Sequence, residues 1–353
     1  GHANPHFYPL DYPGCRQGLV AARVDPFLAP LNQPSPMSSC IFTSIALNYL
    51  PKARVLAESV KRHKPDAHFC VVLCEPVPAW LDLAAEPFDD LCCVEELAPE
   101  TTRSWIFMHS LVELCTAVKG IFLDKALREE GFEYVFYFDP DIVLLGSMDE
   151  LIARFAHASV LLTPHQLEPE QSDQAIRDNE IVSLQHGVYN LGFLGVANDA
   201  AGRRFAGWWR RRLTDYCRDD IPCGLFTDQR WVDLAVAFFE GVEIIRDPGC
   251  NVATWNLPHR WVEEASNGTI LVNGQPITFY HFSGFDSGDQ LSMLNRYGSD
   301  MPALYTLRNW YQDACIARAQ DIPAGHTWPY GHYASGTEIP RQHREIYQMR
   351  ADL

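Results

Sequence analysis

The first half of the chain alternates between continuous apolar runs and segments whose apolar residues recur every three or four positions. Continuous runs predict strands, and the wider spacing predicts helices. The predicted strands cover residues 40–47, 68–73, 91–94, 134–138 and 159–163, and the predicted helices cover 51–63 and 105–130. Pro51 suits the first turn of a helix, and Gly131 suits the end of the longer one. This alternation predicts an α/β fold with a Rossmann-like, mostly parallel central sheet flanked by helices.

The second half of the chain is less regular, which predicts a mixed arrangement of strands and helices. Its predicted elements are strands at 189–196, 270–272 and 277–282, and helices at 205–216 and 228–239. Asn273 and Gly274 separate the last two strands and predict a tight hairpin. Between the halves, Ser147–Glu150 fits a capping box and predicts a further helix. Beyond residue 298 the pattern is helical and then irregular, and the proline-rich residues 1–37 predict an extended arm.

The acidic composition narrows the classes of partner. Lys and Arg total 28 against 45 Asp and Glu, a formal charge of −17 over 353 residues. Such a protein repels phosphate backbones and anionic lipid, so we expect no nucleic acid partner and no membrane-surface partner. No apolar run approaches the roughly 20 residues of a membrane helix, and the first residues lack a signal-peptide pattern. We therefore expect a cytoplasmic protein that receives any anionic substrate through a metal or a few local cations.

The 11 cysteines are odd in number and have no regular spacing. Five of them, Cys70, Cys74, Cys92, Cys93 and Cys115, lie in apolar segments, as small buried hydrophobic residues do. We expect reduced thiols in the core rather than disulfides or a zinc site.

The sharpest local feature is a pair of carboxylates at the end of an apolar strand. Asp139 and Asp141 directly follow the residues 136–138. Doubly wound sheets bind ligands at the carboxyl ends of their strands, so both side chains are expected where a substrate would lie. Carboxylates suit Mg²⁺ or Mn²⁺, and such ions bridge carboxylates to substrate phosphates. By itself the same pattern also fits a simple Asp-Pro-Asp turn.

Six short motifs carry a resemblance to a known family. They are Thr43–Tyr49, Glu113–Lys119, Asp139–Asp141, Asn190–Phe193, Asp228–Gln229 and Tyr280–Gly284. In this order, from about Cys40 to Phe285, the chain resembles bacterial GT-A glycosyltransferases, particularly glycosyltransferase family 8, whose members are retaining and contain a DxD motif. The resemblance implies a GT-A catalytic domain at 38–298, with a nucleotide-binding half at 38–165 and an acceptor half at 166–298. Residues 299–353 would form a helical or irregular extension.

The resemblance also implies roles for individual residues. Asp139, Asp141 and His281 would hold Mn²⁺ or Mg²⁺. The catalytic residues would be Asn190, Asp228 and Gln229, and the donor would be bound by Ala46, Asn48, Tyr49, Lys119, Asp139, Gly192 and Gly284. The implied reaction transfers a hexose from a UDP-sugar to a glycan or lipid-linked glycan with retention. Its implied setting is bacterial surface polysaccharide synthesis at the inner face of the membrane.

The chain departs from the family in one motif. The late family motif continues to a lysine on the donor phosphates, and Ser287 occupies that position here. The phosphate charge would then be met by Arg296, Lys119 or the metal. For the acceptor, Trp255 and Asn256 lie in a polar and aromatic stretch that suits sugar binding. A well-packed loop explains that stretch equally well.

Taken singly, each residue also has a purely structural explanation. Lys119 fits a solvated helix lysine, and Asn190 fits a strand bulge or turn. Asp228 fits a helix cap, and His281 fits a hydrogen-bonded core histidine. Their common order along the chain favours the functional interpretation.

Two other functions stay open at this point. A sugar-nucleotide nucleotidyltransferase also uses a Rossmann-like sheet and Mg²⁺, but it carries a glycine-rich basic loop after the first strand. Here that place holds Asn48–Pro51, without glycine. A catalytically silent carbohydrate-binding protein with the same fold is the second alternative, against which the intact acids at 139 and 141 argue.

The stereochemical outcome also stays open. A free carboxylate at Asp228 would act as a base and favour inversion rather than retention.

Overall fold

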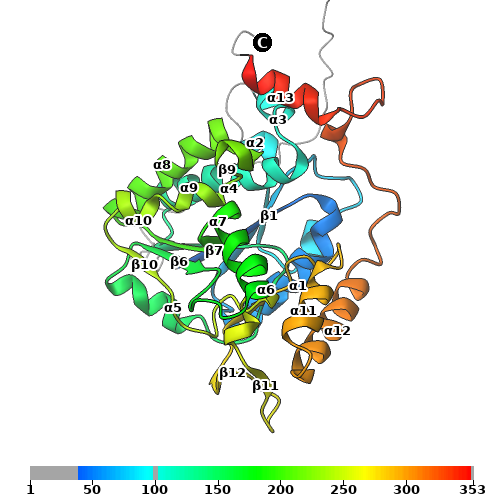
Figure 1. Cartoon of the computed structure of the whole chain (residues 1–353). Helices are drawn as coiled ribbons and strands as arrows, with labels where there is room; N and C mark the ends of the chain where they lie inside the picture. The colour runs from blue at the N-terminus through cyan, green and yellow to red at the C-terminus, as the bar shows by residue number, and fades with distance from the viewer. Residues whose placement is uncertain (1–38, 98–101, 351–353) are drawn as a thin grey trace, which may run out of the picture. The chain divides into compact units, whose positions relative to one another are not determined.

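A seven-stranded sheet forms the centre of the fold. The computed structural model describes residues 39–97 and 102–350, which belong to one compact unit, Pro36–Leu353. The arm predicted at 1–37 lies outside the described residues. The strand order is β10-β6-β7-β4-β1-β2-β3 (Figure 1). In chain order, the strands are β1 (Ser39–Ile45), β2 (His68–Leu73), β3 (Asp90–Cys93), β4 (Tyr134–Phe138), β6 (Val160–Pro164), β7 (Tyr189–Ala197) and β10 (Val242–Ile244).

The sheet is mostly parallel, as the sequence predicts. β4, β1, β2 and β3 run parallel to one another, and β10 runs parallel to β6. Only β7 is antiparallel, to β4 on one side and to β6 on the other. All these strands except the short β10 were predicted from their apolar runs.

Helices cover both faces of the sheet because alternate residues of each strand point to opposite sides. In β1, Phe42 packs into the core that includes α4 (Leu111–Lys125) and α8 (Ala200–Tyr216), whereas Ile41 packs into the core that includes α1 (Leu50–His63). α4 and α8 approach closely at Gly120, where a Cβ atom would lie 2.9 Å from the Cα of Arg210. A larger residue at Gly120 would force these two helices apart.

The single long helix predicted at 105–130 is wrong. The chain forms α3 (Thr102–Phe107), breaks, and begins α4 with a capping box at Ser110. The Ser110 hydroxyl accepts the N–H of Glu113, and the Glu113 carboxylate accepts the N–H of Ser110. This reciprocal pair stabilises a new helix start that outweighs the continuous helical spacing. The predicted end is confirmed, since a π-helical turn at Ala126–Glu130 stops at Gly131, whose φ is +74°.

Two other helix predictions also need correction. The helix predicted at 228–239 is two short helices, α9 (Gln229–Val232) and α10 (Ala235–Phe238). The capping box predicted at 147–150 is wrong: Ser147 accepts the N–H of Asp149 at 3.0 Å, and α5 (Asp149–Ala153) begins too late for a reciprocal bond. The pattern did not predict the short helices α2 (Val94–Leu97), α6 (Asp173–Ala175) and α7 (Val182–His186), nor α11 (Asp289–Tyr297).

The hairpin at Asn273-Gly274 forms, but its second arm is shorter than predicted. β12 (Ile270–Val272) pairs with β13 (Gln275–Pro276) and with β11 (Val262–Glu264), and both turn residues have positive φ, 51° and 79°. The chain then leaves the hairpin, and β14 (Phe279–His281) pairs with β5 (Ile142–Leu144). This exchange of partner sets His281 opposite Ile142, directly after Asp141. A second two-stranded pair is formed by β8 (Asp219–Asp220) and β9 (Leu225–Phe226).

The C-terminal segment returns to the loop after β2 and to α3. After α12 (Pro302–Ala317), an irregular stretch leads to α13 (Arg341–Met349), which lies beside α3 in Figure 1. Along that stretch the His326 ring contacts the buried Glu75 carboxylate at 2.6 Å, and the Trp328 indole donates to the carbonyl of Cys74 at 2.9 Å. The segment is therefore tied to the loop that follows β2. None of the helices in the described ranges is long and apolar enough to cross a membrane.

Candidate functional site

A cavity of about 560 Å³ opens at the carboxyl ends of β1 and β4. Every residue that the sequence predicts for the site lines it, except Asn256. The predicted lining residues are Ala46, Asn48, Tyr49, Lys119, Asp139, Asp141, Asn190, Gly192, Asp228, Gln229, Trp255, His281 and Gly284. Residues from distant parts of the chain therefore meet in one hollow.

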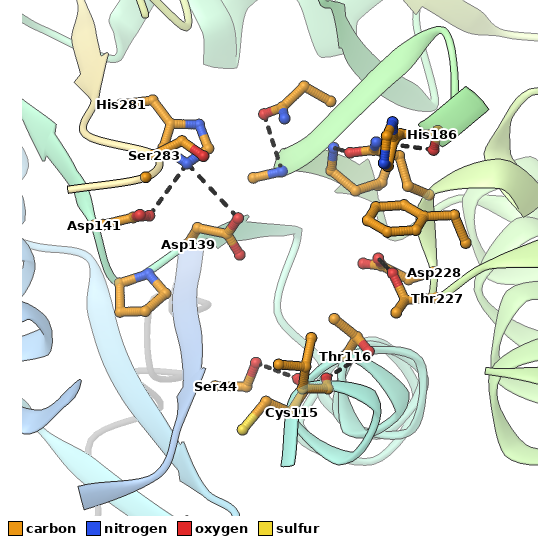
Figure 2. Close-up of a pocket in the computed structure, with 18 of the residues that line it drawn as sticks. Ser44, Cys115, Thr116, Asp139, Asp141, His186, Thr227, Asp228, His281 and Ser283 are labelled. Atoms are coloured by element: carbon orange, nitrogen blue, oxygen red, sulfur yellow. Dashed lines mark hydrogen bonds and ion pairs between the residues drawn. The ribbon is translucent and has the colours of Figure 1, made fainter. Parts of the chain in front are cut away.

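Asp139, Asp141 and His281 form a compact group of metal-ligand type, as Figure 2 shows. Their nearest ligand atoms all lie within 4.8 Å of one another. The His281 Nε2 atom is 3.1 Å from Asp141 Oδ1 and 3.8 Å from Asp139 Oδ2. Two ligands on neighbouring positions of an octahedral ion are about 3 Å apart, so this spacing fits a divalent cation.

The orientation of the His281 ring also fits a cation. Its Nδ1 atom lies 3.2 Å from the side-chain oxygen of Asn251 and donates to it, which leaves the Nε2 lone pair facing the two carboxylates. A lone pair that faces two anions is repelled unless a proton or a metal ion lies between them. Burial would lower the pKa of His281, but Asp141 and Asp139 outweigh that effect and raise the pKa above its usual value.

A chain of side-chain amides holds Asn251 in this orientation. The Asn251 amide nitrogen donates to Thr163 at 3.1 Å and to the side-chain oxygen of Asn190 at 3.0 Å. Asn190 in turn donates to Nε2 of His165 at 3.2 Å, while the other ring nitrogen of His165 contacts the carbonyl of Val188. Each group has a defined donor or acceptor role, so the chain sets the direction of the His281 ring.

Gly192 makes room for that ring. A Cβ atom on Gly192 would lie 2.5 Å from Cε1 of His281 and 2.8 Å from the side-chain oxygen of Asn190. The carbonyl of Gly192 also accepts the N–H of Asp139 at 2.8 Å, which joins β7 to the first carboxylate. Only glycine permits this close approach.

Lys119 is buried beside two carboxylates, so its interpretation as a solvated helix lysine is wrong. Its side chain is 3% exposed, and its Nζ atom lies 2.9 Å from Asp228 and 3.3 Å from Asp139. Burial alone would lower the pKa of Lys119, but Asp139 and Asp228 hold it well above its usual value. Lys119 is therefore a cation shared by the metal-ligand group and by Asp228.

Asp228 does not cap α9 with its side chain. It stands at the N-cap, yet no side-chain capping bond forms, and its carboxylate is held by Lys119 and by the Thr227 hydroxyl. Thr227 has a φ of 42°, a strained value for a β-branched residue and one that is common at functional sites. Burial raises the pKa of Asp228, and Lys119 opposes that rise.

Gln229 joins the wall of the cavity to the sheet. Its side-chain oxygen accepts the N–H of Leu191 at 3.0 Å, and its nitrogen donates to the carbonyl of His186 at 3.0 Å. With both ends of the amide bonded to backbone, Gln229 holds β7 and α7 at a fixed spacing.

The opposite wall of the cavity is the turn after β1. Ala46, Asn48 and Tyr49 line it, and the N–H of Leu47 at its centre donates to Glu75 at 2.6 Å. Burial raises the pKa of Tyr49, and the nearby Asp286 adds to the rise.

Ser287, which replaces the family lysine, and Arg296, which was considered for the phosphate charge, are both engaged elsewhere. The Ser287 hydroxyl bonds to Asp289 at 2.8 Å, and Arg296 forms an ion pair with Asp178.

Trp255 and Asn256 have different surroundings, although they are adjacent. Trp255 lines the cavity, with its ring edge-on to His165 and to His281 at 5.5 and 5.3 Å between ring centres. The Asn256 side chain points away, donating to the Asn251 carbonyl and accepting the N–H of Ala253. Asn256 therefore supports its own loop and does not line this cavity.

Comparison with known proteins gives partial sequence matches. No protein-family model matches the chain. The chain is 31% identical to the uncharacterized protein YfnF of Bacillus subtilis (strain 168) over 179 residues, 49% of this chain and 57% of YfnF. It is 25% identical to the uncharacterized protein YfnD of the same strain over 248 residues, 69% of this chain and 76% of YfnD. The match to YfnF thus spans little more than half of that protein.

Solved structures similar to this chain include three glycosyltransferases. A glycosyltransferase involved in glycosylation of the major capsid of PBCV-1 is 12% identical, with 70% of this chain and 93% of that chain covered and a TM-score of 0.40. The galactosyltransferase LgtC, in complex with donor and acceptor sugar analogs, is 17% identical, with 70% and 87% covered and a TM-score of 0.39. Mouse xyloside xylosyltransferase 1 is 14% identical, with 70% and 97% covered and a TM-score of 0.41.

Several residues in and around the site escaped the sequence analysis, among them Tyr137, Asn251 and Lys52. The Tyr137 hydroxyl donates to Asp139 Oδ1 at 2.6 Å, which leaves Oδ2 of Asp139 toward His281. Tyr137 could have been predicted to lie beside Asp139, since it stands two residues earlier on a strand and residues i and i+2 share a face. Asn251 lay in a stretch noted only for sugar binding. Lys52, paired with Asp286 at 2.6 Å and 4.1 Å from the Tyr49 ring centre, gave no signal beyond a helix lysine.

Proposed function

We propose that this protein is a metal-dependent GT-A glycosyltransferase that transfers a hexose from a UDP-sugar to a glycan or lipid-linked glycan. The observation that carries the proposal is the Asp139, Asp141 and His281 group at the edge of the cavity. Carboxylates with an imidazole suit Mn²⁺ or Mg²⁺, and the mixed donor set favours Mn²⁺. When bound, the ion would neutralise the charge of a diphosphate leaving group.

The charge of the protein explains why such a group is needed. At −17, the chain repels a free nucleotide diphosphate. Lys119 is already balanced by Asp139 and Asp228, and Lys52 is already paired with Asp286. A diphosphate would therefore be attracted by a divalent cation that Asp139, Asp141 and His281 hold.

The remaining residues divide between the two ends of the donor. The turn at Ala46, Asn48 and Tyr49 would hold the base and the ribose. Asn190 and Gly192 would border the transferred sugar on the other side of the metal-ligand group, together with Gln229 and Asp228. This division matches a nucleotide-binding half at 38–165 and an acceptor half at 166–298.

The state of Asp228 favours retention. A general base needs a carboxylate that is free to accept a proton. The Asp228 carboxylate is buried and engaged by Lys119 and Thr227. Asp228 and Lys119 would therefore position the sugar, and the acceptor hydroxyl would attack from the face that the diphosphate leaves. We place the reaction in bacterial surface polysaccharide synthesis, at the cytoplasmic side of the membrane.

A nucleotidyltransferase is less consistent with the turn after β1. Such an enzyme uses free backbone N–H groups in that turn to bind a triphosphate. Here the N–H of Leu47 is taken by the buried Glu75 carboxylate, and the residues 46–51 contain no glycine.

The proposal is tested by binding and turnover together. Calorimetry with a panel of nucleotide sugars, in Mn²⁺ and in EDTA, is expected to find one UDP-sugar that binds only with metal. Asp141→Asn keeps the shape of the side chain but removes the charge, and it should abolish that binding. Asp300→Asn, a change at an exposed carboxylate of the loop before α12, should leave it intact. Release of UDP in the presence of glycan acceptors then measures transfer. Failure of every nucleotide sugar to bind, with or without metal, would refute the proposal.

A further inference from the structure

A second, smaller cavity of about 260 Å³ lies behind the loop that carries Trp255. Trp255 lines the first cavity, whereas the next residue, Asn256, lines the second. The walls of the second cavity include Arg246 and Arg260.

Arg260 is a buried cation without a carboxylate partner. The residue is only 4% exposed, and its guanidinium donates to the carbonyl of Cys250 at 2.8 Å. No ion pair to Arg260 occurs among residues 39–97 and 102–350. Burial lowers the pKa of Arg260 to about 10. A buried charge is costly to leave unpaired, and Arg260 lines the cavity.

The other walls of the cavity add a second cation. Arg246 is exposed, and no ion pair joins it to any carboxylate of the described chain. Gln166 also lines the cavity, but its side-chain oxygen is buried and its nitrogen donates to the carbonyl of Trp255 at 2.9 Å. The cavity thus offers charged donors from two arginines.

The acidic groups nearby do not cancel this charge. Glu168 lines the cavity but is exposed to water. The buried Glu170 carboxylate is engaged by His259 at 3.1 Å and by Asn179 at 2.6 Å. Asp247 attracts Arg260 through space without forming an ion pair, and its carboxylate accepts the N–H of Gly249 at 2.8 Å. Among the lining residues, two arginines therefore face one carboxylate, that of Glu168.

We propose that this second cavity binds an oxyanion carried by a sugar, either a carboxylate or a phosphate ester. Arg260 and Arg246 would hold the anion, since a guanidinium matches the geometry of both groups. The volume is just below the usual range of about 300–1,000 Å³ for ligand cavities, so it suits one sugar residue rather than a nucleotide.

The position of the cavity assigns it to the acceptor. Neighbouring residues of one loop line both cavities, so a glycan whose end lies in the first can extend toward the second. This assignment rests on the proposed transferase function, whereas the binding of a sugar anion does not. An acidic acceptor would also explain why a strongly negative protein keeps an unpaired buried arginine.

Calorimetry in EDTA, without nucleotide, tests the binding alone. The probes are glucuronate, glucose 6-phosphate, inorganic phosphate and uncharged glucose. Wild-type protein is expected to bind at least one charged sugar about tenfold or more tightly than glucose and than inorganic phosphate. Tighter binding of glucuronate assigns the carboxylate as the natural anion, and tighter binding of glucose 6-phosphate assigns the phosphate ester.

Variants locate the binding in this cavity. Arg246→Gln, an exposed change with little risk to folding, should weaken it about tenfold or more. Arg260→Lys keeps the positive charge but loses the paired N–H donors of the guanidinium, so it should weaken binding. Thermal unfolding checks that this variant is folded. Arg211→Gln on α8 removes an exposed arginine elsewhere and should have no effect. Equal affinity for charged and neutral sugars, or unchanged affinity in Arg246→Gln, would overturn the proposal. EDTA removes the metal, so this assay does not depend on donor binding. If no nucleotide sugar binds in the Asp141→Asn experiment, the result for the second cavity still stands.

Discussion

Replacing Gly192 by alanine should uncouple His281 from the metal-ligand group. The added Cβ would lie 2.5 Å from Cε1 of His281, against an ordinary contact of 3.4–4 Å. The ring must therefore move by about 1 Å, whereas metal–ligand distances tolerate only about 0.2 Å. The His281 Nε2 atom, now 3.1 Å from Asp141, would leave the position in which it can share an ion.

Gly192→Ala would therefore remove one of the three proposed metal ligands. Disturbing the groups that orient a metal ligand costs about 10–100-fold in affinity, or about 1.4–2.7 kcal/mol. Titration of the apoprotein with Mn²⁺, followed by calorimetry or by the spin-resonance signal of free Mn²⁺, measures this directly. Gly331→Ala is the matched control, since its Cβ would meet only Trp328, at an ordinary 3.5 Å.

A double variant separates the mechanism from general damage. If Gly192→Ala acts only through the ring, adding it to His281→Ala should weaken Mn²⁺ binding no further. Wild-type Mn²⁺ affinity in a folded Gly192→Ala protein would refute the placement of His281 as a ligand. An additional loss in the double variant would show that the methyl group acts by another route.

Two further predictions concern the stability of buried charged and titratable groups. Lys119→Met leaves the buried Asp228 carboxylate without its cation, so the free energy of unfolding in urea at pH 7.5 should fall by about 3–5 kcal/mol. Lys64→Met breaks only an exposed pair and should cost less than about 1 kcal/mol, and equal losses would contradict the burial argument. Burial lowers the pKa of His109 to about 4, below the 6.5 of the unfolded chain, so the unfolded state takes up the proton first as pH falls. Urea unfolding should therefore show a loss of about 2 kcal/mol from pH 7.5 to 5 due to His109, absent from His109→Gln; an identical pH slope in both proteins would rule it out.

The part of the site that the sequence predicts best is local. Asp139 and Asp141 follow an apolar strand, and the edge of the sheet at which that strand ends could be inferred from the pattern alone. Gly131 likewise ends its helix where expected, because a left-handed residue at a helix end is a local requirement.

What the sequence could not predict depends on partners distant along the chain. The run at 277–282 looks like the second arm of a hairpin, and only its pairing with β5 brings His281 to Asp141. The burial of Lys119 likewise depends on Asp228, more than a hundred residues later. Neither the solvation of a lysine nor the partner of a short strand is contained in local periodicity.

The contact of the C-terminal segment with the loop after β2 has a consequence for synthesis in the cell. His326 meets the Glu75 carboxylate across a sequence separation of 251 residues, and that carboxylate supports the turn at Leu47. At about 5–20 residues per second, the ribosome adds His326 roughly 13–50 s after Glu75. During that interval the nascent chain holds a carboxylate that still lacks its last partner. A chain that ends before residue 326 would therefore contain every strand of the central sheet but would lack this contact, which makes the C-terminal segment the last part to reach the loop after β2.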